Sequence, residues 1–513
     1  MKIANLKDSS VALMGVILLA KLIGILRDIV IANYFGTTNV SDAFLIALSV
    51  PTILFYLIGH ALSTAYIPMY NRVKVENGEH RAQQFSNNLL TIAMAFSILI
   101  VLVLICFPRT VVKIFASGFD QETADIAIRL IRISSPSIFI MCAVNVFGGY
   151  LQANKSFLVP AAISLPRNAA IVAAVVLAAS LGVNWLGYGL LTSYVMELFL
   201  LLPFMLKKGY VYKPQMNLKD DYMRQTLYVV APIVLGVCVG QVNKIVDRSM
   251  ASTIVEGGIS ALNYASFINN GVQEVLVTGI VTILFAKCSE YAAKQEHQKV
   301  KQKLSETLDA MILLLIPACV GVLVLVEPIV SLILCRGEFD QHSLEMTAGA
   351  LRFYTLGLLF LAIRDTLVKV FYAYKETRIT TIVSVTAILG NIVLNFVLGH
   401  FMGINGLALA TSLSAIYSCI FLYILLRKRI GDCGFKNMLI IALKSVVGCL
   451  PMAATAYYLN RQEWIHTMGI GGLAICVLLS CAVYFIAEII LRNKQVLKVL
   501  RLQRKTDKQG DAL

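Results

Sequence analysis

The chain has 513 residues, of which 58% are apolar and only 14% are charged, whereas soluble proteins are nearer half apolar and a quarter charged. This composition excludes a soluble enzyme with a small anchor, a disordered chain and a disulfide scaffold, and it indicates a polytopic helical membrane protein. The formal net charge of +15 would suit nucleic-acid binding, so the positions of the basic residues have to be considered.

Apolar stretches recur along the whole chain, and each is long enough to cross about 30 Å of hydrocarbon. The first stretch follows two lysines, as a signal peptide would, but it is too long, contains Lys21 and lacks a cleavage site. An outer-membrane barrel would show short alternating segments instead. We therefore predict fourteen helical spans, at residues 9–34, 43–69, 86–107, 124–151, 158–181, 184–206, 225–250, 259–286, 306–326, 345–373, 379–399, 404–426, 437–459 and 466–491.

Basic residues are distributed unevenly over the loops between these spans. The odd-numbered loops hold only Arg109, Lys113, Arg336 and Arg461. The even-numbered loops and the chain ends hold many more, with clusters at 207–224, 287–303, 427–436 and 492–508. By the positive-inside rule, both termini and the even-numbered loops lie in the cytoplasm. The basic charge is therefore a topology signal, and no nucleic-acid partner is expected.

Several landmarks recur about 220 residues later in the chain, which indicates an internal duplication. The paired landmarks are Pro108 and Pro328, FDQ at 119–121 and at 339–341, Arg132 and Arg352, Lys155 and Lys375, and GVNWLG at 182–187 with GINGLA at 403–408. Each copy holds six spans, so both copies have the same topology and are related by a pseudo-twofold axis along the membrane normal. Secondary transporters use this arrangement, with the substrate site at the repeat interface, although a channel could share it.

The fold class is therefore all-α, with about fourteen transmembrane helices in two six-helix lobes and an additional helix pair. The predicted lobe boundaries follow the repeat. They are 1–224 for the N-terminal lobe with spans one to six, 225–435 for the C-terminal lobe with spans seven to twelve, 436–491 for the helix pair, and 492–513 for a basic cytoplasmic tail.

Charged residues inside the spans are expected to face a cavity or a partner, because a lone charge in hydrocarbon is costly. The first two helices of each copy concentrate such charges, and Lys21 shares a helical face with Asp28. A cavity with a cationic excess suits an anionic solute such as a pyrophosphate. The alternative is that Arg27–Asp28 and Asp247–Arg248 are self-neutralising pairs. The predicted substrate-binding residues are Lys21, Arg27, Asp28, Asp42, His60, Lys244, Arg248 and Glu274.

A second polar group lies in spans eleven and twelve. Asn391 and Asn395 share a face, and Thr411 lies in the next span. With Asp247, their oxygens could coordinate a hard monovalent cation, although interhelical hydrogen bonding is the more common use of such residues. No phosphate loop, HExxH, GxSxG or CxxC motif is present, so neither an enzyme nor a bound cofactor is expected.

The first two spans, AKLIGILRDIVIANYFGTTNVSDAFLIALSVPTILFYLIGHALSTAYIPMY, resemble those of the MurJ/MviN family, which is related to MATE and Wzx-type transporters. The motifs that carry the resemblance are Gly24, Arg27, Asp28, Phe35, Gly36, Ser41, Asp42, Ala43, Phe44, Pro51 and Pro68. The likeness covers the full chain. It implies fourteen spans and translocation of lipid II, the undecaprenyl-pyrophosphate-linked peptidoglycan precursor, from the inner to the outer leaflet, and hence a role in cell-wall biogenesis and cell shape.

The resemblance also implies roles for individual residues. Two of the family's cavity arginines match Lys21 and Arg27, whereas two others match Phe55 and Phe267, and a family acidic residue matches His60. These departures leave open a flippase for another polyprenyl-linked oligosaccharide, or a MATE-type exporter. A sodium site of some members matches Asp247, Asn391, Asn395, the Leu407 backbone and Thr411. Coupling is expected to come from sodium or from the membrane potential.

The expected setting is the bacterial cytoplasmic membrane, with a lipid-linked glycan as substrate. Cell-wall synthesis proteins are candidate partners, and a monomer is expected.

Overall fold

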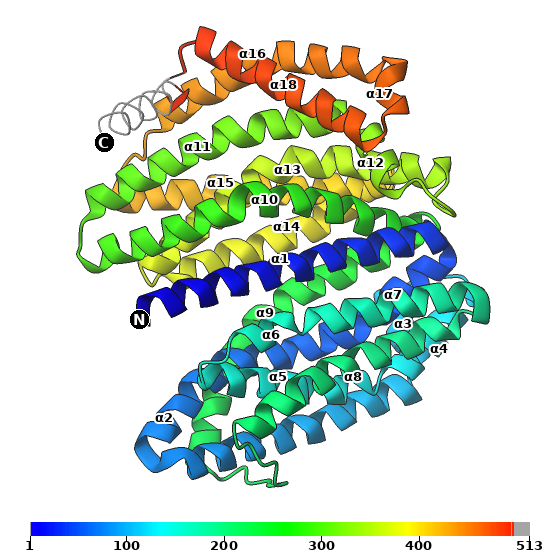
Figure 1. Ribbon diagram of the computed structural model, residues 1–513, viewed down its shortest axis with the longest axis vertical. Helices are drawn as coiled ribbons and strands as arrows, with labels where there is room; N and C mark the ends of the chain where they lie inside the picture. The colour runs from blue at the N-terminus through cyan, green and yellow to red at the C-terminus, as the bar shows by residue number, and fades with distance from the viewer. Residues whose placement is uncertain (1, 494, 497–513) are drawn as a thin grey trace. The chain divides into compact units, whose positions relative to one another are not determined.

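The computed structural model describes residues 2–493, 495 and 496, and within them all regular elements are α-helices (Figure 1). By packing, the chain forms two compact units, Met1–Ser260 with Arg336–Asp340, and Ala261–Cys335 with Gln341–Leu513. The first unit holds α1 (Lys2–Phe35), α2 (Asn39–Cys106), α3 (Pro108–Phe115), α4 (Gln121–Ser134), α5 (Ser137–Ala153), α6 (Leu158–Ala162), α7 (Ser164–Leu181), α8 (Asn184–Lys207) and α9 (Asp221–Ile254).

Helix α10 (Gly258–Ala293) begins in the first unit and continues in the second. The remaining helices are α11 (His297–Val324), α12 (Val326–Leu334), α13 (Gln341–Ala373), α14 (Thr377–Met402), α15 (Ile404–Ile430), α16 (Phe435–Asn460), α17 (Glu463–Thr467) and α18 (Ile470–Ile490). Helix α9 packs in the first unit, although the repeat assigns it to the second copy. The predicted lobe boundaries remain a prediction, and most of the tail at 492–513 lies outside the described residues.

Each of the fourteen predicted spans falls on one helix or on two consecutive helices. Within the described residues, 11 helices are long and apolar enough to cross a membrane, or 12 if the bent pair α4–α5 is one span. That pair is bent by 46°, which matches the predicted span 124–151. Predicted spans two and three are parts of one 68-residue helix, α2, which is broken at Gly78 (φ 82°). The all-helical membrane fold is confirmed, while the count of fourteen remains a prediction.

In the first unit, α2 packs against α4, α5 and α9, and α7 packs between α1 and α8. A chain of tyrosine rings fills the region where α2 meets α5. Tyr66 lies beside Tyr70, Tyr70 contacts the edge of Tyr150, and Tyr150 contacts Tyr210. The Tyr66 hydroxyl is 2.7 Å from that of Ser86, so this buried ring has a hydrogen-bond partner.

In the second unit, α13 packs against both α11 and α15, and α16 packs between α11 and α18. Membrane helices associate through close packing and interhelical hydrogen bonds, because lipid tails are as apolar as leucine. Gly357 of α13 shows this, since a Cβ there would lie 2.6 Å from the Ser412 hydroxyl of α15. That hydroxyl donates to the carbonyl of Phe353 at 2.6 Å. The small residue therefore allows the close contact of α13 with α15.

The backbone repeats the duplication that the sequence indicates. Two residues beyond the end of α5, Lys155 has the left-handed conformation (φ 61°), and two residues beyond the end of α13, Lys375 has the same conformation (φ 60°). The same three backbone hydrogen bonds close both ends, including Ser156 N–H to Leu151 and Glu376 N–H to Phe371. Such helix ends satisfy carbonyl groups that the helix leaves unpaired. The lysines at the two matched positions thus occupy equivalent turns.

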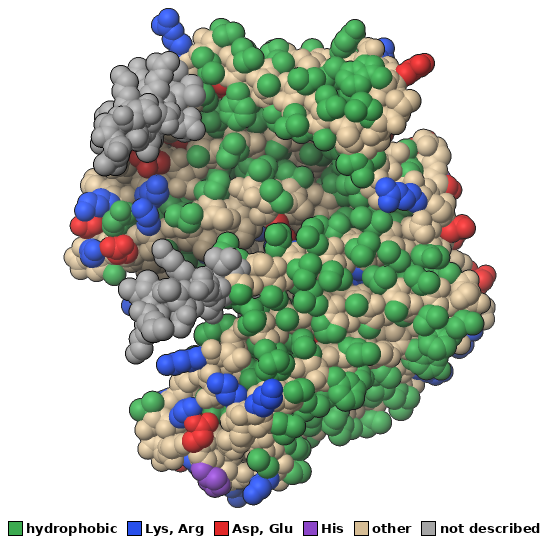
Figure 2. All heavy atoms as spheres, in the orientation of Figure 1, with side chains coloured by type: hydrophobic (Ala, Val, Ile, Leu, Met, Phe, Trp, Pro, Cys, Tyr) green, Lys and Arg blue, Asp and Glu red, His purple; other side chains and the backbone are tan. Residues whose placement is uncertain are grey.

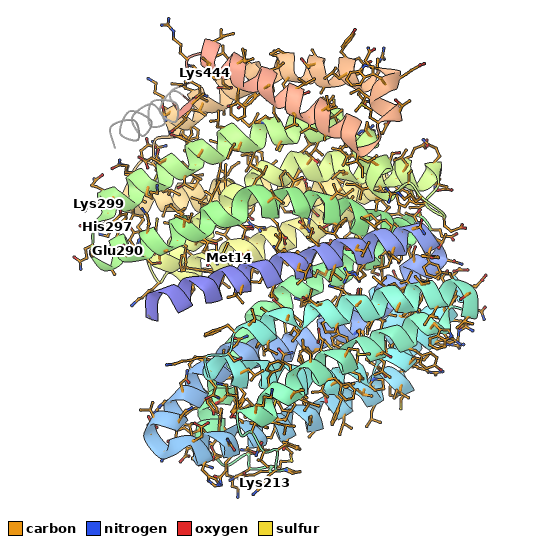
Figure 3. All side chains as sticks on the ribbon, viewed as in Figure 1. Met14, Lys213, Glu290, His297, Lys299 and Lys444 are labelled. Carbon is orange, nitrogen blue, oxygen red and sulfur yellow. The ribbon has the colours of Figure 1, made fainter. Side chains whose placement is uncertain are left out.

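Hydrophobic side chains cover the flanks of the helices in each unit, and charged side chains gather near the helix ends (Figure 2). Glu290, His297 and Lys299 lie at the turn between α10 and α11, for example (Figure 3). Large apolar side chains on the outward faces include Phe199 and Leu450. Continuous exposed apolar surface of this kind is expected of a protein solvated by lipid.

Candidate functional site

Arg27 of α1 forms the best-defined charged group among the predicted site residues. Its Nε and Nη2 atoms donate to the same Asp28 oxygen at 3.0 and 2.8 Å, and Nη1 donates to Asn168 of α7 at 3.2 Å. Asp28 is buried, and Arg27 is partly buried. The predicted Arg27–Asp28 pair is therefore present, and Asn168 is a third member that the sequence did not indicate.

A second ion pair lies next to this group in the first unit. Arg167 of α7 lies 3.3 Å from Glu197 of α8, whose side chain is almost fully buried. Arg167 and Asn168 are adjacent in the sequence, so α7 carries a partner for both α1 and α8. Glu197 is the only charged residue between 184 and 206. That isolation within an apolar stretch is the signal that could have identified it.

Asp42, predicted to face the cavity, is buried at the start of α2. Its Oδ1 accepts hydrogen bonds from the backbone N–H of Ser260 at 2.8 Å and from the Ser260 hydroxyl at 2.5 Å. Ser260 lies in the first turn of α10, where backbone N–H groups lack helical partners. The structure thus uses Asp42 to cap α10, and its predicted contact with substrate remains a prediction.

Helix α9 carries three of the predicted residues. Lys244 is exposed, and Asp247 accepts a hydrogen bond from Asn243 at 3.1 Å. Arg248 donates to the backbone carbonyl of Leu45 in α2 at 3.0 Å. A guanidinium held by a carbonyl keeps its charge, so Arg248 can still attract an anion.

Lys21 is exposed on α1, and the side chain of His60 lies outside the described residues. At the two positions where the family resemblance led us to expect arginine, Phe55 is buried and Phe267 is partly buried. The Phe55 ring packs against Gly59 one turn later, since a Cβ at Gly59 would lie 2.2 Å from it. An arginine at position 55 would need a different local packing.

In the second unit, Glu274 lines a pocket of about 600 Å³ between α10 and α13. Gln273 donates to Asp365 at 3.0 Å, and Arg364 donates to the other oxygen of Asp365 at 3.1 and 2.7 Å. Lys369 lies over the rings of Phe285 and Tyr372. The structure therefore brings Glu274 of α10 together with Asp365 and Lys369 of α13 at one pocket.

The predicted cation ligands of the second unit lie on α14 and α15, which pack together. Asn395 donates to the Asn391 side-chain oxygen at 3.2 Å, and the Thr411 hydroxyl donates to the Leu407 carbonyl at 3.1 Å. Carboxamide, hydroxyl and carbonyl oxygens fit a hard cation in kind. Asp247, the fifth predicted ligand, belongs to the other compact unit. No cluster of three or more His, Cys, Asp or Glu suited to a metal occurs among the described side chains.

Comparisons with known proteins cover most of the chain. A probable lipid II flippase MurJ of Thermotoga maritima is 27% identical over 94% of this chain and 96% of its own length. A lipid II flippase MurJ of Burkholderia cenocepacia is 25% identical over the same shares. Among solved structures, a lipid II flippase MurJ in an inward closed conformation is 25% identical and covers 94% of this chain and 99% of its own, with a TM-score of 0.81.

An inward-facing MATE transporter of the MOP superfamily shares the fold at a TM-score of 0.68, with 15% identity over 82% of this chain and 98% of its own. The all-helical fold of the chain thus belongs to a class that includes lipid II flippases and MATE transporters. Within that class, the model of the MurJ lipid II flippases matches residues 31–479. The chain belongs to the MurJ family.

Proposed function

We propose that the chain moves lipid II from the inner to the outer leaflet of the bacterial cytoplasmic membrane by alternating access. The match of the MurJ family model over residues 31–479 carries this proposal. The anionic headgroup enters a polar cavity, the polyprenyl tail stays in the bilayer, and a conformational change exposes the headgroup on the other side. Translocation makes and breaks no covalent bond, so the protein acts as a transporter and not as an enzyme.

To bind the pyrophosphate of the substrate, a cationic side chain has to exchange its carboxylate partner in the protein for the phosphate oxygens. Arg27 supplies a planar set of donors, which suits bidentate binding of phosphate. In the structure, its Nε and Nη2 atoms both bind the Asp28 carboxylate. We infer that Asp28 neutralises Arg27 when no substrate is bound and that the pyrophosphate displaces this contact. Lys21, on the same face of α1 as Asp28, adds a second positive charge.

We further propose that a monovalent cation or the membrane potential drives the return step. Asn391, Asn395, Thr411 and the Leu407 carbonyl would hold sodium, with Asp247 supplying negative charge. The cation would have to replace the hydrogen bonds from Asn395 to Asn391 and from Thr411 to Leu407. The membrane potential alone is worth about 2.3 kcal/mol per charge per 100 mV.

The orientation we propose places both termini in the cytoplasm, in accordance with the distribution of basic loop residues. The protein is proposed to work as a monomer, with cell-wall synthesis proteins as candidate partners. Flippases for other polyprenyl-linked saccharides and MATE-type exporters share the fold class, but the family match favours lipid II.

The decisive experiment reconstitutes the purified protein in liposomes with labelled lipid II and measures the headgroup that becomes accessible on the opposite side. We expect translocation with lipid II and rescue of cells depleted of their own lipid II flippase. Translocation of another polyprenyl-linked saccharide with no activity on lipid II would assign the alternative substrate. Drug resistance on overexpression without rescue would assign a MATE-type exporter.

A further inference from the structure

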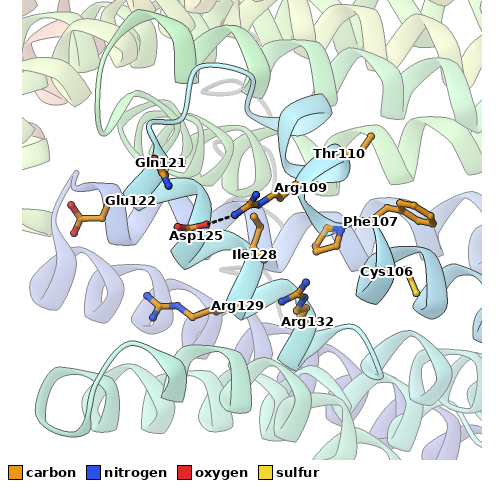
Figure 4. Close-up of a pocket in the computed structure, with 11 residues that line it drawn as sticks. Cys106, Phe107, Arg109, Thr110, Gln121, Glu122, Asp125, Ile128, Arg129 and Arg132 are labelled. Carbon is orange, nitrogen blue, oxygen red and sulfur yellow. Dashed lines mark ion pairs between the residues drawn. The ribbon is translucent and has the colours of Figure 1, made fainter.

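The first unit contains a pocket of about 1010 Å³ that the flippase mechanism does not use (Figure 4). It lies where α2 ends, between the short helix α3 and the first half of the bent pair α4–α5. Three arginines line it, Arg109 from α3 and Arg129 and Arg132 from α4. In the proposed orientation, these segments are at the outer side of the membrane.

Two of the three arginines are not neutralised. Arg109 lies 3.8 Å from Asp125, which is too long for a hydrogen bond. The guanidinium groups of Arg129 and Arg132 form no ion pair or hydrogen bond with any described residue. They are three residues apart on α4, so they share one face of the helix. Glu122 and Asp125 also line the pocket, but neither forms an ion pair with Arg129 or Arg132. A pair of cations on one helix face, without an ion-pair partner, attracts an anion that can bridge them.

The second copy shows how the same position looks when its charge is neutralised. Arg352, the counterpart of Arg132, lies 2.5 Å from Glu327. The counterpart of Glu327 in the first copy is Phe107, which is 63% exposed. The first copy therefore keeps the arginine and replaces its carboxylate partner with an exposed aromatic ring.

At the position of Arg129, too, the first copy carries a positive charge that the second copy lacks. Its counterpart is Gly349, where a Cβ would lie 2.6 Å from the Asn405 side-chain oxygen. A side chain at that position would have to displace the Asn405 amide. In the first copy the matching position is exposed and carries a second arginine. The basic pocket is thus a feature of one copy alone and not a by-product of the duplicated fold.

The surroundings of the pocket suit a lipid more than a free ion. The last turns of α2 expose Leu102, Val103 and Ile105, which run to the pocket beside Phe107. Helix α3 buries Val111, Val112 and Phe115, while its charged residues face outward. A short amphipathic helix of this kind lies at a membrane–water interface. A phosphate held by Arg129 and Arg132 would leave acyl chains beside the apolar end of α2.

We propose that this pocket binds the phosphate of an anionic phospholipid in the outer half of the membrane, held by Arg129 and Arg132. Basic pockets beside membrane helices recognise lipid headgroups in this way. The site goes beyond the flippase function, because it lies between α3 and α4 and uses none of the residues proposed to bind lipid II.

Native mass spectrometry of the detergent-purified protein, titrated with phosphatidylglycerol or phosphatidylcholine, tests the proposal. We expect retention of phosphatidylglycerol in preference to phosphatidylcholine. The double variant Arg129→Gln/Arg132→Gln should bind phosphatidylglycerol at least about tenfold more weakly, as expected for the loss of two charge-assisted hydrogen bonds.

Two single variants sharpen the test. Phe107→Glu recreates the carboxylate of the second copy beside Arg132 and should also weaken binding, and it removes little packing because Phe107 is exposed. Arg352→Gln, at the paired counterpart, should bind phosphatidylglycerol as the unaltered protein does. Thermal unfolding of each variant without lipid establishes that it is folded.

Equal retention of both lipids, or unchanged phosphatidylglycerol binding by the double variant, would overturn the proposal. Millimolar inorganic phosphate provides the remaining arm of the experiment. If phosphate alone abolishes lipid retention, the pocket is a site for free phosphate and the lipid assignment is wrong. Retention in the presence of phosphate supports the lipid.

Discussion

Arg27 contacts two groups, one charged and adjacent in the sequence, the other neutral and on a different helix. Asp28 is its neighbour in the sequence, and the bonds at 3.0 and 2.8 Å need no particular tertiary structure. Asn168 comes from α7 and binds the remaining amino group at 3.2 Å. A neutral amide orients a guanidinium without cancelling its charge. Asn168 therefore positions the Arg27 guanidinium, while the Asp28 carboxylate compensates its positive charge.

Replacing Arg27 by Ala should abolish lipid II translocation. It also leaves the buried Asp28 carboxylate without its cation, which we expect to lower stability by about 1–3 kcal/mol. The double variant Arg27→Ala/Asp28→Asn removes that unpaired charge, so it should regain stability without regaining translocation. Liposome translocation and thermal unfolding, measured side by side, separate the two effects. Translocation by the double variant would show that Arg27 serves only to neutralise Asp28.

Some of these contacts could be predicted from the sequence and others could not. Adjacent opposite charges in a span, such as Arg27–Asp28, pair locally and are therefore predictable. The contact of Arg27 with Asn168, and that of Arg167 with Glu197, depend on which helices become neighbours. The sequence placed Asp42 in the cavity because it is an intramembrane carboxylate, while its local role is set by Ser260, more than 200 residues later.

At the scale of elements, the recurring FDQ motif has a structural reason in the first copy. Phe119 closes a turn onto the Ala116 carbonyl, as Phe339 does onto that of Arg336. Asp120 then caps α4 by accepting the Thr123 N–H at 3.1 Å. Such caps satisfy backbone groups that a helix start leaves unpaired. The motif is therefore a turn followed by a helix start.

The cap makes a pH-dependent prediction. Hydrogen bonds from the Thr123 side chain and backbone hold the pKa of the Asp120 carboxyl below its usual 3.8. The cap therefore contributes above that pH and is lost as the pH falls through the lower pKa of the folded state. Asp120→Ala should cost about 0.5–2 kcal/mol at neutral pH. The gap in unfolding temperature between variant and parent should narrow only below about pH 3.8. A gap that already closes at pH 6 would contradict the assignment.

The matched helix ends at Lys155 and Lys375 allow a symmetric prediction. A left-handed backbone is unfavourable for lysine and favourable for glycine. A left-handed residue with a Cβ costs about 1–2 kcal/mol, and ordering a glycine offsets part of this gain, so Lys155→Gly and Lys375→Gly should each stabilise the protein by up to about 1 kcal/mol. Lys155→Ala and Lys375→Ala are the controls, since they remove the charge and keep the strained backbone. Thermal unfolding that shows a gain for alanine as large as that for glycine would mean that the charge, and not the backbone, is responsible.

The positions of the helices were predictable because apolar length and loop charge are local properties. The break at Gly78 could not be predicted in this way. The polar stretch 70–85 is typical of a loop, but in the structure it is helical on both sides of the glycine. The compact units of the structure change over at Ser260, whereas the predicted lobe boundary at residue 224 follows the sequence repeat and remains a prediction. Packing depends on which helix faces match, which periodicity alone does not determine.

At the scale of the whole molecule, the two copies differ in the order of the charges that their first helices carry. The first copy has the order Arg27–Asp28 in its first helix, and the second copy has Asp247–Arg248 at the matched positions. Inverted order places opposite charges at equivalent places in the two copies. Under the proposed sodium coupling, the first copy would bind the anionic substrate and Asp247 of the second copy would supply negative charge to the cation.

Sodium dependence tests this division of roles. If translocation in liposomes rises with sodium, Asp247→Asn should abolish that rise and leave a basal rate in potassium. Asn391→Leu should do the same, because it removes a second oxygen ligand, whereas Asp365→Asn, outside the predicted ligand set, should leave the sodium response intact. A full sodium response in Asp247→Asn would remove the cation site and leave the membrane potential as the driving force.

Cys106 at the end of α2 is exposed and lines the arginine pocket, which gives the protein a natural reporter group. A maleimide that cannot cross membranes, added to intact spheroplasts, should label Cys106 if this end of α2 faces outward, and Cys106→Ser should lose that label. Added anionic lipid should slow the labelling by covering the thiol. The same side chain thus reports on the direction of insertion and on the occupancy of the pocket, without any engineered probe.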